Sequence, residues 1–230
     1  MMPPFNGKKA VVLLSGGLDS ATVLAHVLRE GYAAYALSFS YGQRQTVELE
    51  AAEHLAKTMG AASWRLAHVD LRAMGGSALT SDVDVPPADP TSTAIPVTYV
   101  PARNTIFLSY ALGYAEVLGA YDLFIGANVV DYSGYPDCRP AFVQAFEHLA
   151  NVATRAADGG PRYRVHAPLM HLKKKDIIVL GQSLGVDYSL THSCYDPVGH
   201  LACGRCDACY LRRRGFLEAG VEDPTAYASP

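Results

Sequence analysis

The sequence predicts an α/β protein in which a parallel, Rossmann-like sheet carries helices on both faces. Short apolar runs alternate with segments whose apolar residues recur at helical spacing, which is the pattern of such a sheet. The first apolar run ends at two glycines, and a helical segment begins directly after them. The chain has 230 residues, 50% of them apolar and 18% charged. This length and composition suffice for a buried core and exclude a disordered chain.

In the N-terminal part of the chain, short apolar runs typical of strands alternate regularly with segments of helical spacing. Its first segment is apolar and ends at glycines, as a buried parallel strand does. Gly31 and Gly60 are placed to end the two helices that follow. The predicted order is strand, helix, strand, helix, strand over Lys9–Leu14, Asp19–Glu30, Tyr32–Ser40, Thr46–Met59 and Trp64–Val69.

The long segment of residues 70–96, which follows, has no periodicity. Glycines and prolines interrupt it, and a loop of this length is usually functional or mobile, with a plain insertion as the alternative. Pro140 fits the first turn of a later helix, where a missing N–H costs nothing. Beyond the loop, the predicted order is helix, strand, helix, strand, helix over Ala102–Leu118, Tyr121–Gly126, Pro140–Ala156, Tyr163–Ala167 and Lys174–Leu184.

The turn between the first strand and the first helix has the chemistry of a phosphate site. It reads Ser-Gly-Gly-Leu-Asp-Ser from Ser15 to Ser20. The two glycines leave room for a phosphate near the main chain, and the helix N-terminus attracts an anion. The two serines can donate hydrogen bonds to phosphate oxygens, while Asp19 can hold magnesium. A glycine turn with an ordinary helix cap is the structural alternative.

Four of the five cysteines lie close together near the C-terminus. They are Cys194, Cys203, Cys206 and Cys209, with the spacing C-x8-C-x2-C-x2-C. Four thiolates saturate a tetrahedral zinc ion and leave no position for water, so the spacing indicates one structural zinc. The alternatives are an iron–sulfur cluster, whose bacterial spacing differs, and cysteines without metal. Cys138 stands alone and is interpreted as an incidental thiol, or as a nucleophile activated by Arg139.

Charge is divided unevenly along a chain whose formal charge is −3. The segment from Arg162 to Arg214 carries a net charge of +5 and the remainder −8. A basic third suggests contact with phosphate or nucleic acid. Arg212–Arg214 are interpreted as solvated charge at a helix end. The first apolar run is too short for a signal peptide and no run spans a membrane, so we expect a cytoplasmic protein.

The motifs together resemble a known enzyme family. LLSGGLDS is similar to the SGGxDS loop of the ATP pyrophosphatases. That loop, the cysteine spacing and the segments Leu37–Ala52, Tyr99–Glu116 and Gly126–Phe146 resemble the 7-cyano-7-deazaguanine (preQ0) synthase family over nearly the whole chain. Gln45 departs from the histidine common at its position. The resemblance implies an adenine nucleotide alpha hydrolase-like domain over residues 1–190, with a zinc-binding segment and helix over 191–230 packed on it.

The reaction implied by this resemblance is an ATP-dependent ligation. Such enzymes convert 7-carboxy-7-deazaguanine and ammonia into the nitrile preQ0 through an adenylated carboxylate and an adenylated amide, releasing AMP and pyrophosphate. The implied cofactors are ATP as substrate, Mg²⁺ and one structural Zn²⁺. A homodimer is implied as well, and neither nucleic acid nor membrane is expected as a partner. The basic third is then interpreted as serving ATP and a carboxylate.

Site residues follow from the resemblance and from helix-end positions. The expected catalytic residues are Ser15, Asp19, Ser20 and Lys174. The expected ATP-binding residues are Leu13, Leu14, Ser15, Gly16, Gly17, Leu18, Asp19, Ser20, Ala21, Thr22, Val23, Arg103 and Asn104. The expected substrate-binding residues are Tyr132, Ser133, Tyr135 and Asp137. Tyr41, Gln43 and Arg44 follow the second strand and are placed to line the nucleotide pocket.

Each assignment has a structural alternative. Arg103 and Asn104 can act as helix caps, the lysines can be surface charge, and the tyrosines can cover the core. For the protein as a whole, the alternatives are a tRNA-modifying enzyme of the same superfamily and a nucleotide sensor without catalysis.

Overall fold

The chain folds around a five-stranded parallel sheet of strand order β3-β2-β1-β4-β5. The structure, a computed structural model, describes residues 5–43, 46–92, 94–130 and 135–228. β1 is central, and the chain runs to β2 and β3 on one side of it before crossing to β4 and β5 on the other. Loops that leave the sheet on the two sides of such a switch point open a crevice. The strands are β1 (Lys9–Leu13), β2 (Ala33–Ser40), β3 (Ser63–His68), β4 (Asp122–Phe124) and β5 (Arg164–His166).

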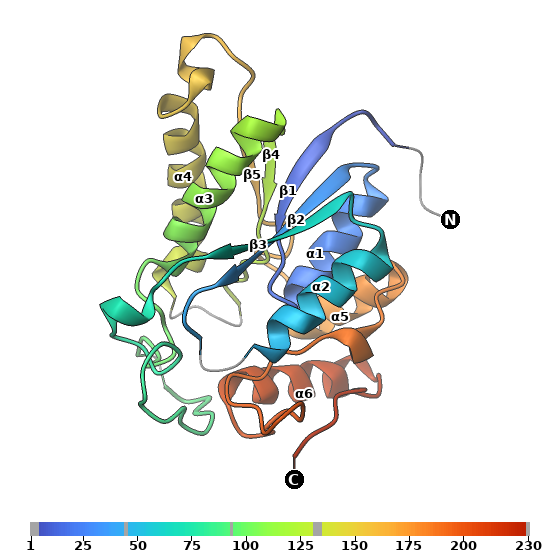
Figure 1. Ribbon diagram of the computed structural model, residues 1–230. Helices are drawn as coiled ribbons and strands as arrows, with labels where there is room; N and C mark the ends of the chain where they lie inside the picture. The colour runs from blue at the N-terminus through green and yellow to red at the C-terminus, as the bar shows by residue number, and fades with distance from the viewer. Residues whose placement is uncertain (1–4, 44–45, 93, 131–134, 229–230) are drawn as a thin grey trace.

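Helices cover both faces of the sheet, which confirms the predicted class (Figure 1). One face carries α3 (Arg103–Leu118) and α4 (Pro140–Val152). The other carries α1 (Leu18–Arg29) and α2 (Val47–Met59). α5 (Lys174–Ser183) packs against α1, and α6 (Asp207–Ala219) packs against α5 as an outer layer.

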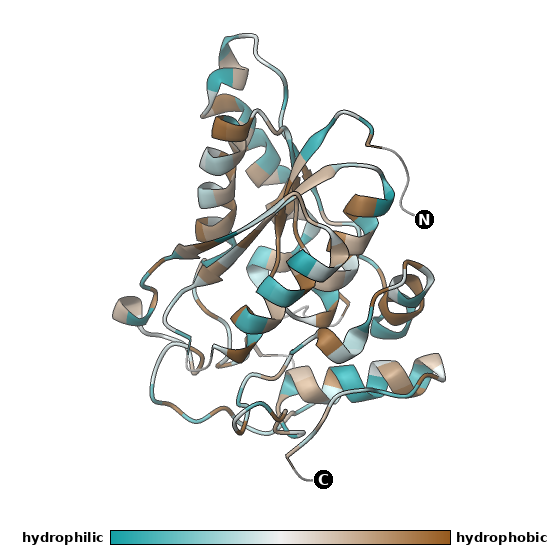
Figure 2. Cartoon of the chain, turned by 45° about the vertical axis from the view of Figure 1, so that its right-hand side comes forward, coloured by the Kyte–Doolittle hydropathy of each residue, from teal (hydrophilic) through white to brown (hydrophobic). Residues whose placement is uncertain are grey.

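The central strand shows why the sheet is buried on both sides. Val11 and Leu13 belong to the core cluster under α3, whereas Ala10 and Val12 belong to the cluster under α1. Side chains alternate across a strand, so both sets must be apolar when both faces are covered. Figure 2 shows hydrophobic residues concentrated where the central strands lie.

The predicted elements are present, and β4 and α4 differ most from their expected bounds. β4 ends at Phe124, before the predicted Gly126. A Cβ atom on Gly126 would lie 3.4 Å from the Ser20 backbone nitrogen, so the chain there packs on the start of α1 and leaves the sheet. α4 ends at Val152 because Thr154 accepts a hydrogen bond from the Ala156 N–H and begins a separate 3₁₀ turn.

The long loop of residues 70–96 is folded onto the protein. A 3₁₀ turn (Arg72–Met74) begins it, and Leu71, Leu79 and Val85 are buried. The Ala88 N–H donates to the Arg205 carbonyl at 2.8 Å. This bond connects the loop to residues 192–209, which contain the four clustered cysteines and are called the cysteine segment below. The structure therefore gives the loop a packing role.

The arginine run in α6 corrects one expectation. Arg212 is 3% exposed and donates to Asp223 Oδ1 at 3.0 Å, Thr191 Oγ1 at 2.7 Å and the Tyr188 carbonyl at 3.0 Å. The interpretation as solvated charge is wrong for Arg212, because α6 turns this position inward, and the three arginines lie in the middle of α6, not at its end as expected. Across the described ranges, no helix has the length and apolar character needed to cross a membrane.

Candidate functional site

A cleft of about 210 Å³ opens where the loops leave the carboxyl ends of β1, β2 and β4. Its walls include the predicted ATP-binding residues Leu13, Leu14, Ser15, Gly17, Leu18, Asp19, Ser20, Arg103 and Asn104. Ala21, Thr22 and Val23 do not line it; they are buried in the core, where Thr22 Oγ1 donates to the Leu18 carbonyl at 2.9 Å. The structure thus gathers the loop and α3 around one cleft and places the second turn of α1 behind it.

At Gly16, the first glycine of the phosphate loop, the backbone adopts a conformation that only glycine permits. Gly16 has a φ of +87°, and a Cβ atom there would lie 2.0 Å from the Glu48 carbonyl oxygen on α2. Ser20 Oγ accepts from the Ser15 N–H at 3.1 Å and donates to the Gly17 carbonyl at 3.0 Å. The backbone of α1 begins directly behind the loop, so its first N–H groups face the cleft as an anion site.

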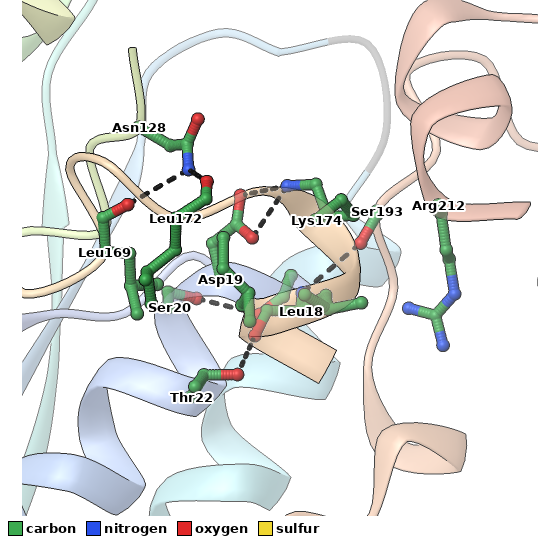
Figure 3. Close-up of polar contacts among 12 residues, drawn as sticks. Leu18, Asp19, Ser20, Thr22, Asn128, Leu169, Leu172, Lys174, Ser193 and Arg212 are labelled. Atoms are coloured by element: carbon green, nitrogen blue, oxygen red, sulfur yellow. Dashed lines mark hydrogen bonds and ion pairs between the residues drawn. The ribbon is translucent and has the colours of Figure 1, made fainter. Parts of the chain in front are cut away.

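One ion pair joins the phosphate loop to α5. Lys174 Nζ lies 2.8 Å from Asp19 Oδ1 and 2.9 Å from Asp19 Oδ2, and its side chain is 8% exposed (Figure 3). Lys173 is exposed and Lys175 is half-buried. Of the three consecutive lysines, Lys174 is therefore the one held against the loop.

Asn128 positions the segment that precedes this lysine, a role the sequence reasoning missed. The residue is 1% exposed, and its Nδ2 donates to the Leu169 carbonyl at 3.0 Å and to the Leu172 carbonyl at 2.5 Å (Figure 3). It follows β4 at the carboxyl edge of the sheet, which is the one sequence signal that marked it.

The start of α3 carries a second polar group of side chains. Asp137 is buried; its Oδ2 accepts from the Asn104 N–H at 3.0 Å, and its carbonyl accepts from Asn104 Nδ2 at 2.9 Å. Asp137 thus caps the N-terminus of α3 from outside the helix, whereas the N-cap position itself is Ala102, so Arg103 and Asn104 do not cap the helix as the structural alternative expected. Ala102, at a φ of +54°, turns the chain just before Arg103. Tyr135 lines the cleft and shares a hydrogen bond with Thr98 Oγ1 at 2.8 Å. Tyr132 and Ser133 lie outside the described residues.

Arg103 places a positive charge at this end of the cleft, because a guanidinium stays protonated in proteins. Burial opposes the charge, but Tyr41, Tyr195, Tyr135 and Cys138 outweigh it and raise the pKa of Arg103. Burial raises the pKa of the Cys138 thiol to about 11, so that thiol is neutral near pH 7. Cys138 therefore lacks the thiolate that a nucleophile needs.

The four clustered cysteines are brought together in the fold. Their sulfur atoms all lie within 4.8 Å of one another, and Cys203 Sγ is 4.0 Å from Cys209 Sγ. A tetrahedral zinc with bonds of about 2.3 Å separates its sulfurs by roughly 3.8 Å, so the spacing fits a metal ion. Backbone N–H groups of Asp196 and Cys203 donate to Cys194 Sγ at 3.3 and 3.1 Å, as they would to a thiolate.

The cysteine segment also touches the phosphate loop. The His192 N–H donates to the Gly16 carbonyl at 2.9 Å, and Ser193 Oγ accepts from the Leu18 N–H at 3.3 Å (Figure 3). Both residues directly precede Cys194 and line the cleft. The cluster therefore lies within a few residues of the nucleotide loop, although the two are far apart in sequence.

Several further wall residues were not singled out from the sequence. Phe39 stacks on Phe107, with ring centroids 4.0 Å apart. Glu48, His192 and Tyr195 also line the cleft. Their positions depend on packing between α2, α3 and the cysteine segment, and no motif marks them. Tyr41 lines the cleft as expected, Gln43 lines a smaller space beside it, and Arg44 lies outside the described residues.

Comparison with known sequences finds close similarity over nearly the whole chain. A family model described as "Queuosine biosynthesis protein QueC" matches residues 9–220. A 7-cyano-7-deazaguanine synthase of Syntrophotalea carbinolica is 65% identical over 223 residues, covering 96% of this chain and 97% of that protein. The protein of the same name from Geobacter metallireducens is 62% identical over 224 residues, covering 96% of this chain and 94% of that protein.

Solved structures share the fold at low sequence identity. An NMN synthetase from Francisella tularensis superimposes with a TM-score of 0.52 and 18% identity, covering 94% of this chain and 79% of that one. A 4-thiouridine synthetase in complex with RNA and bound ATP gives a TM-score of 0.50 and 19% identity, covering 94% of this chain and 55% of that one. At these identities the comparison shows the architecture alone.

Proposed function

This chain belongs to the QueC family of queuosine biosynthesis proteins, and we propose that it makes 7-cyano-7-deazaguanine from 7-carboxy-7-deazaguanine and ammonia at the cost of ATP. The observation that carries the proposal is the cleft itself. It joins an SGGxDS loop, the lysine on its aspartate and a cationic corner at Arg103, in a chain 65% identical to a synthase of that name.

ATP binding is assigned to the phosphate loop and the α1 N-terminus. The loop amides and the Ser15 hydroxyl donate to the phosphates, since the hydroxyl faces the cleft while Ser20 braces the loop from inside. Asp19 would hold Mg²⁺, which would supply positive charge beside the leaving pyrophosphate. Lys174 lies within 2.9 Å of the same carboxylate and stabilises the same developing charge.

The chemistry activates an oxygen that would otherwise be a poor leaving group. The substrate carboxylate attacks the α-phosphate of ATP, and pyrophosphate leaves. Ammonia then forms the C–N bond as the C–O bond to AMP breaks, and loss of a proton from nitrogen gives the amide. A second ATP activates the amide oxygen in the same way, and loss of AMP and of both N–H protons gives the nitrile. Arg103 is the protonated group placed to orient the carboxylate, because its planar fork matches two carboxylate oxygens.

Other assignments also remain proposals. The four cysteines would hold a structural Zn²⁺, whose role is to fix the segment against the phosphate loop. Tyr132, Ser133, Tyr135 and Asp137 are proposed to bind the deazaguanine ring. The division into residues 1–190 and 191–230, the homodimer and the cytoplasmic location stay predictions from the sequence.

A direct assay tests the proposed reaction. Purified protein is incubated with ATP, Mg²⁺, ammonium and 7-carboxy-7-deazaguanine, and AMP and the nitrile are measured by mass spectrometry. We expect two AMP per nitrile, because two oxygens are removed. AMP release with another carboxylate but not with this one would refute the assignment of the substrate, while the adenylation reaction would stand. An Asp19→Asn variant should fold but release no AMP.

tRNA modification, the main alternative, predicts a different result. Thiolation in this superfamily would need a reactive sulfur, whereas Cys138 is a neutral thiol and the other four cysteines face one another. A tRNA enzyme should shift tRNA in a gel, with binding that weakens steeply as salt rises. Under the proposed function, tRNA should not compete with the carboxylated deazaguanine.

A further inference from the structure

A second, much smaller cavity adjoins the nucleotide cleft. Its volume is about 20 Å³, enough for one molecule the size of water. The cavity and the cleft share four wall residues, Tyr41, Glu48, His192 and Tyr195. A molecule held in the cavity therefore lies directly beside the space in which the nucleotide binds.

The cavity wall has the charge of a cation site. Glu48 is its one carboxylate, and no lysine or arginine of the described ranges lines it. Gln43 Nε2 donates to Glu48 Oε1 at 3.2 Å and fixes this carboxylate. The first turn of α2, which carries Glu48, rests on Gly16 of the phosphate loop. The carboxylate is thus held at a fixed position beside the loop.

A second wall group lacks a partner of its own. His192 is only 9% exposed, and its Nε2 has no hydrogen-bond partner among the residues the structure describes. Its backbone N–H is bound to the Gly16 carbonyl, which fixes the residue beside the phosphate loop. A buried polar nitrogen left unpaired is costly, which points to a small ligand that donates a hydrogen bond to it.

We propose that this cavity is an ammonium-binding site, with Glu48 as its anionic ligand and His192 Nε2 as a second acceptor, and that it supplies nitrogen to the cleft. The proposal rests on the proposed function in one respect, namely that ammonia is the nitrogen source. Ammonium has the size of water and four N–H donors. Alkali-metal ions, in contrast, prefer oxygen ligands to a ring nitrogen. The phenol rings of Tyr41 and Tyr195 complete a wall suited to a small cation.

The same carboxylate can make the bound ion nucleophilic. One N–H bond of ammonium breaks, the proton passes to a Glu48 oxygen, and the electron pair stays on nitrogen as the lone pair of ammonia. That pair then forms the bond to the adenylated carbon while the C–O bond to AMP breaks, and the nitrogen loses a second proton to the departing AMP or to water, which leaves the neutral amide. Burial raises the pKa of Glu48 to about 7, against the opposing effects of Arg103 and the Gln43 hydrogen bond, so the group can exist in either form near neutral pH.

A matched pair of substitutions on one helix tests the site. Glu48→Gln keeps the shape and removes the charge, and Glu50→Gln makes the same change at an exposed position two residues further along α2. For Glu48→Gln we expect the KM for ammonium to rise roughly tenfold or more, the loss expected for a charged hydrogen bond. Pyrophosphate release in a single turnover with the carboxylate substrate and no ammonium should fall much less than nitrile formation at low ammonium. Glu50→Gln should match wild type in both assays.

A binding measurement on the wild-type protein separates the site from the reaction. Ammonium chloride should raise Tm more than potassium or tetramethylammonium chloride at equal ionic strength, and Glu48→Gln should abolish the difference. An equal effect of potassium, or no difference in the wild type, would overturn the site. An unchanged KM for ammonium in Glu48→Gln would also overturn the site. A loss of pyrophosphate release as large as the loss of nitrile formation in this variant would overturn it as well. If ammonium binds but no nitrile forms from the carboxylated deazaguanine, the proposed function fails and the site stands.

Discussion

At the scale of single residues, burial distinguishes side chains that the sequence presents as equivalent. Lys173, Lys174 and Lys175 are identical in type and adjacent in the chain. Only Lys174 starts α5 with its side chain turned inward, where it meets Asp19. Gly215 on α6 makes this possible, because a Cβ atom there would lie 2.4 Å from Lys174 Cγ. A neighbouring helix therefore fixes the direction of the lysine.

The first prediction concerns this lysine. Lys174→Ala should lower kcat for AMP formation by roughly a hundredfold, because it removes a charge placed at the developing pyrophosphate. Lys173→Ala is the matched control and should stay within about twofold of wild type. Steady-state kinetics of AMP release measure both. Equal losses in the two variants would show that general positive charge matters here and the Asp19 contact does not.

At the scale of elements, α6 carries three consecutive arginines, and one of them, Arg212, forms a buried ion pair with Asp223. Burial would raise the pKa of Asp223, but Arg212, Tyr227 and Thr225 outweigh it and hold the pKa below its usual value. The ion pair fastens the C-terminal segment to the helix. Arg214 instead forms an exposed pair with Glu218 on the same helix at 2.6 Å.

The second prediction contrasts these two arginines. Arg212→Ala should lower the free energy of unfolding by about 3 kcal/mol, since it leaves Asp223 charged and buried without its partner. Arg214→Ala should cost no more than about 0.5 kcal/mol, as exposed pairs on a helix do. Urea denaturation of the zinc-loaded protein measures both values. Similar costs for the two variants would contradict the burial of Arg212.

At the scale of the whole molecule, the cysteine cluster and the nucleotide loop form one structural unit. His192 and Ser193 hold Gly16 and Leu18, and Cys194 of the cysteine cluster follows directly. The long loop of residues 70–96 braces the same segment through Arg205. A change in the cluster should therefore reach the ATP site through two residues of backbone.

The third prediction follows from that connection. Removal of zinc with a chelator should lower Tm by roughly ten degrees or more and raise the KM for ATP, because binding of a structural zinc contributes directly to folding. Readdition of zinc should restore both. Cys138→Ser, outside the cluster, should retain one zinc per chain by atomic absorption. An unchanged KM for ATP in the zinc-free protein would show that the cluster does not affect the nucleotide site.

The sequence by itself determined the fold class, the phosphate loop and the cysteine set, because these depend on local period and short spacing. β1, α1 and the four cysteines lie where those patterns place them. Tertiary packing alone decided that Lys174 faces Asp19, that Arg212 is buried and that Glu48 and His192 share a small cavity beside the cleft. These contacts join elements distant in the chain, and each depends on which side of a helix faces its neighbour. No short motif encodes that, so only the tertiary structure shows the small cavity beside the cleft.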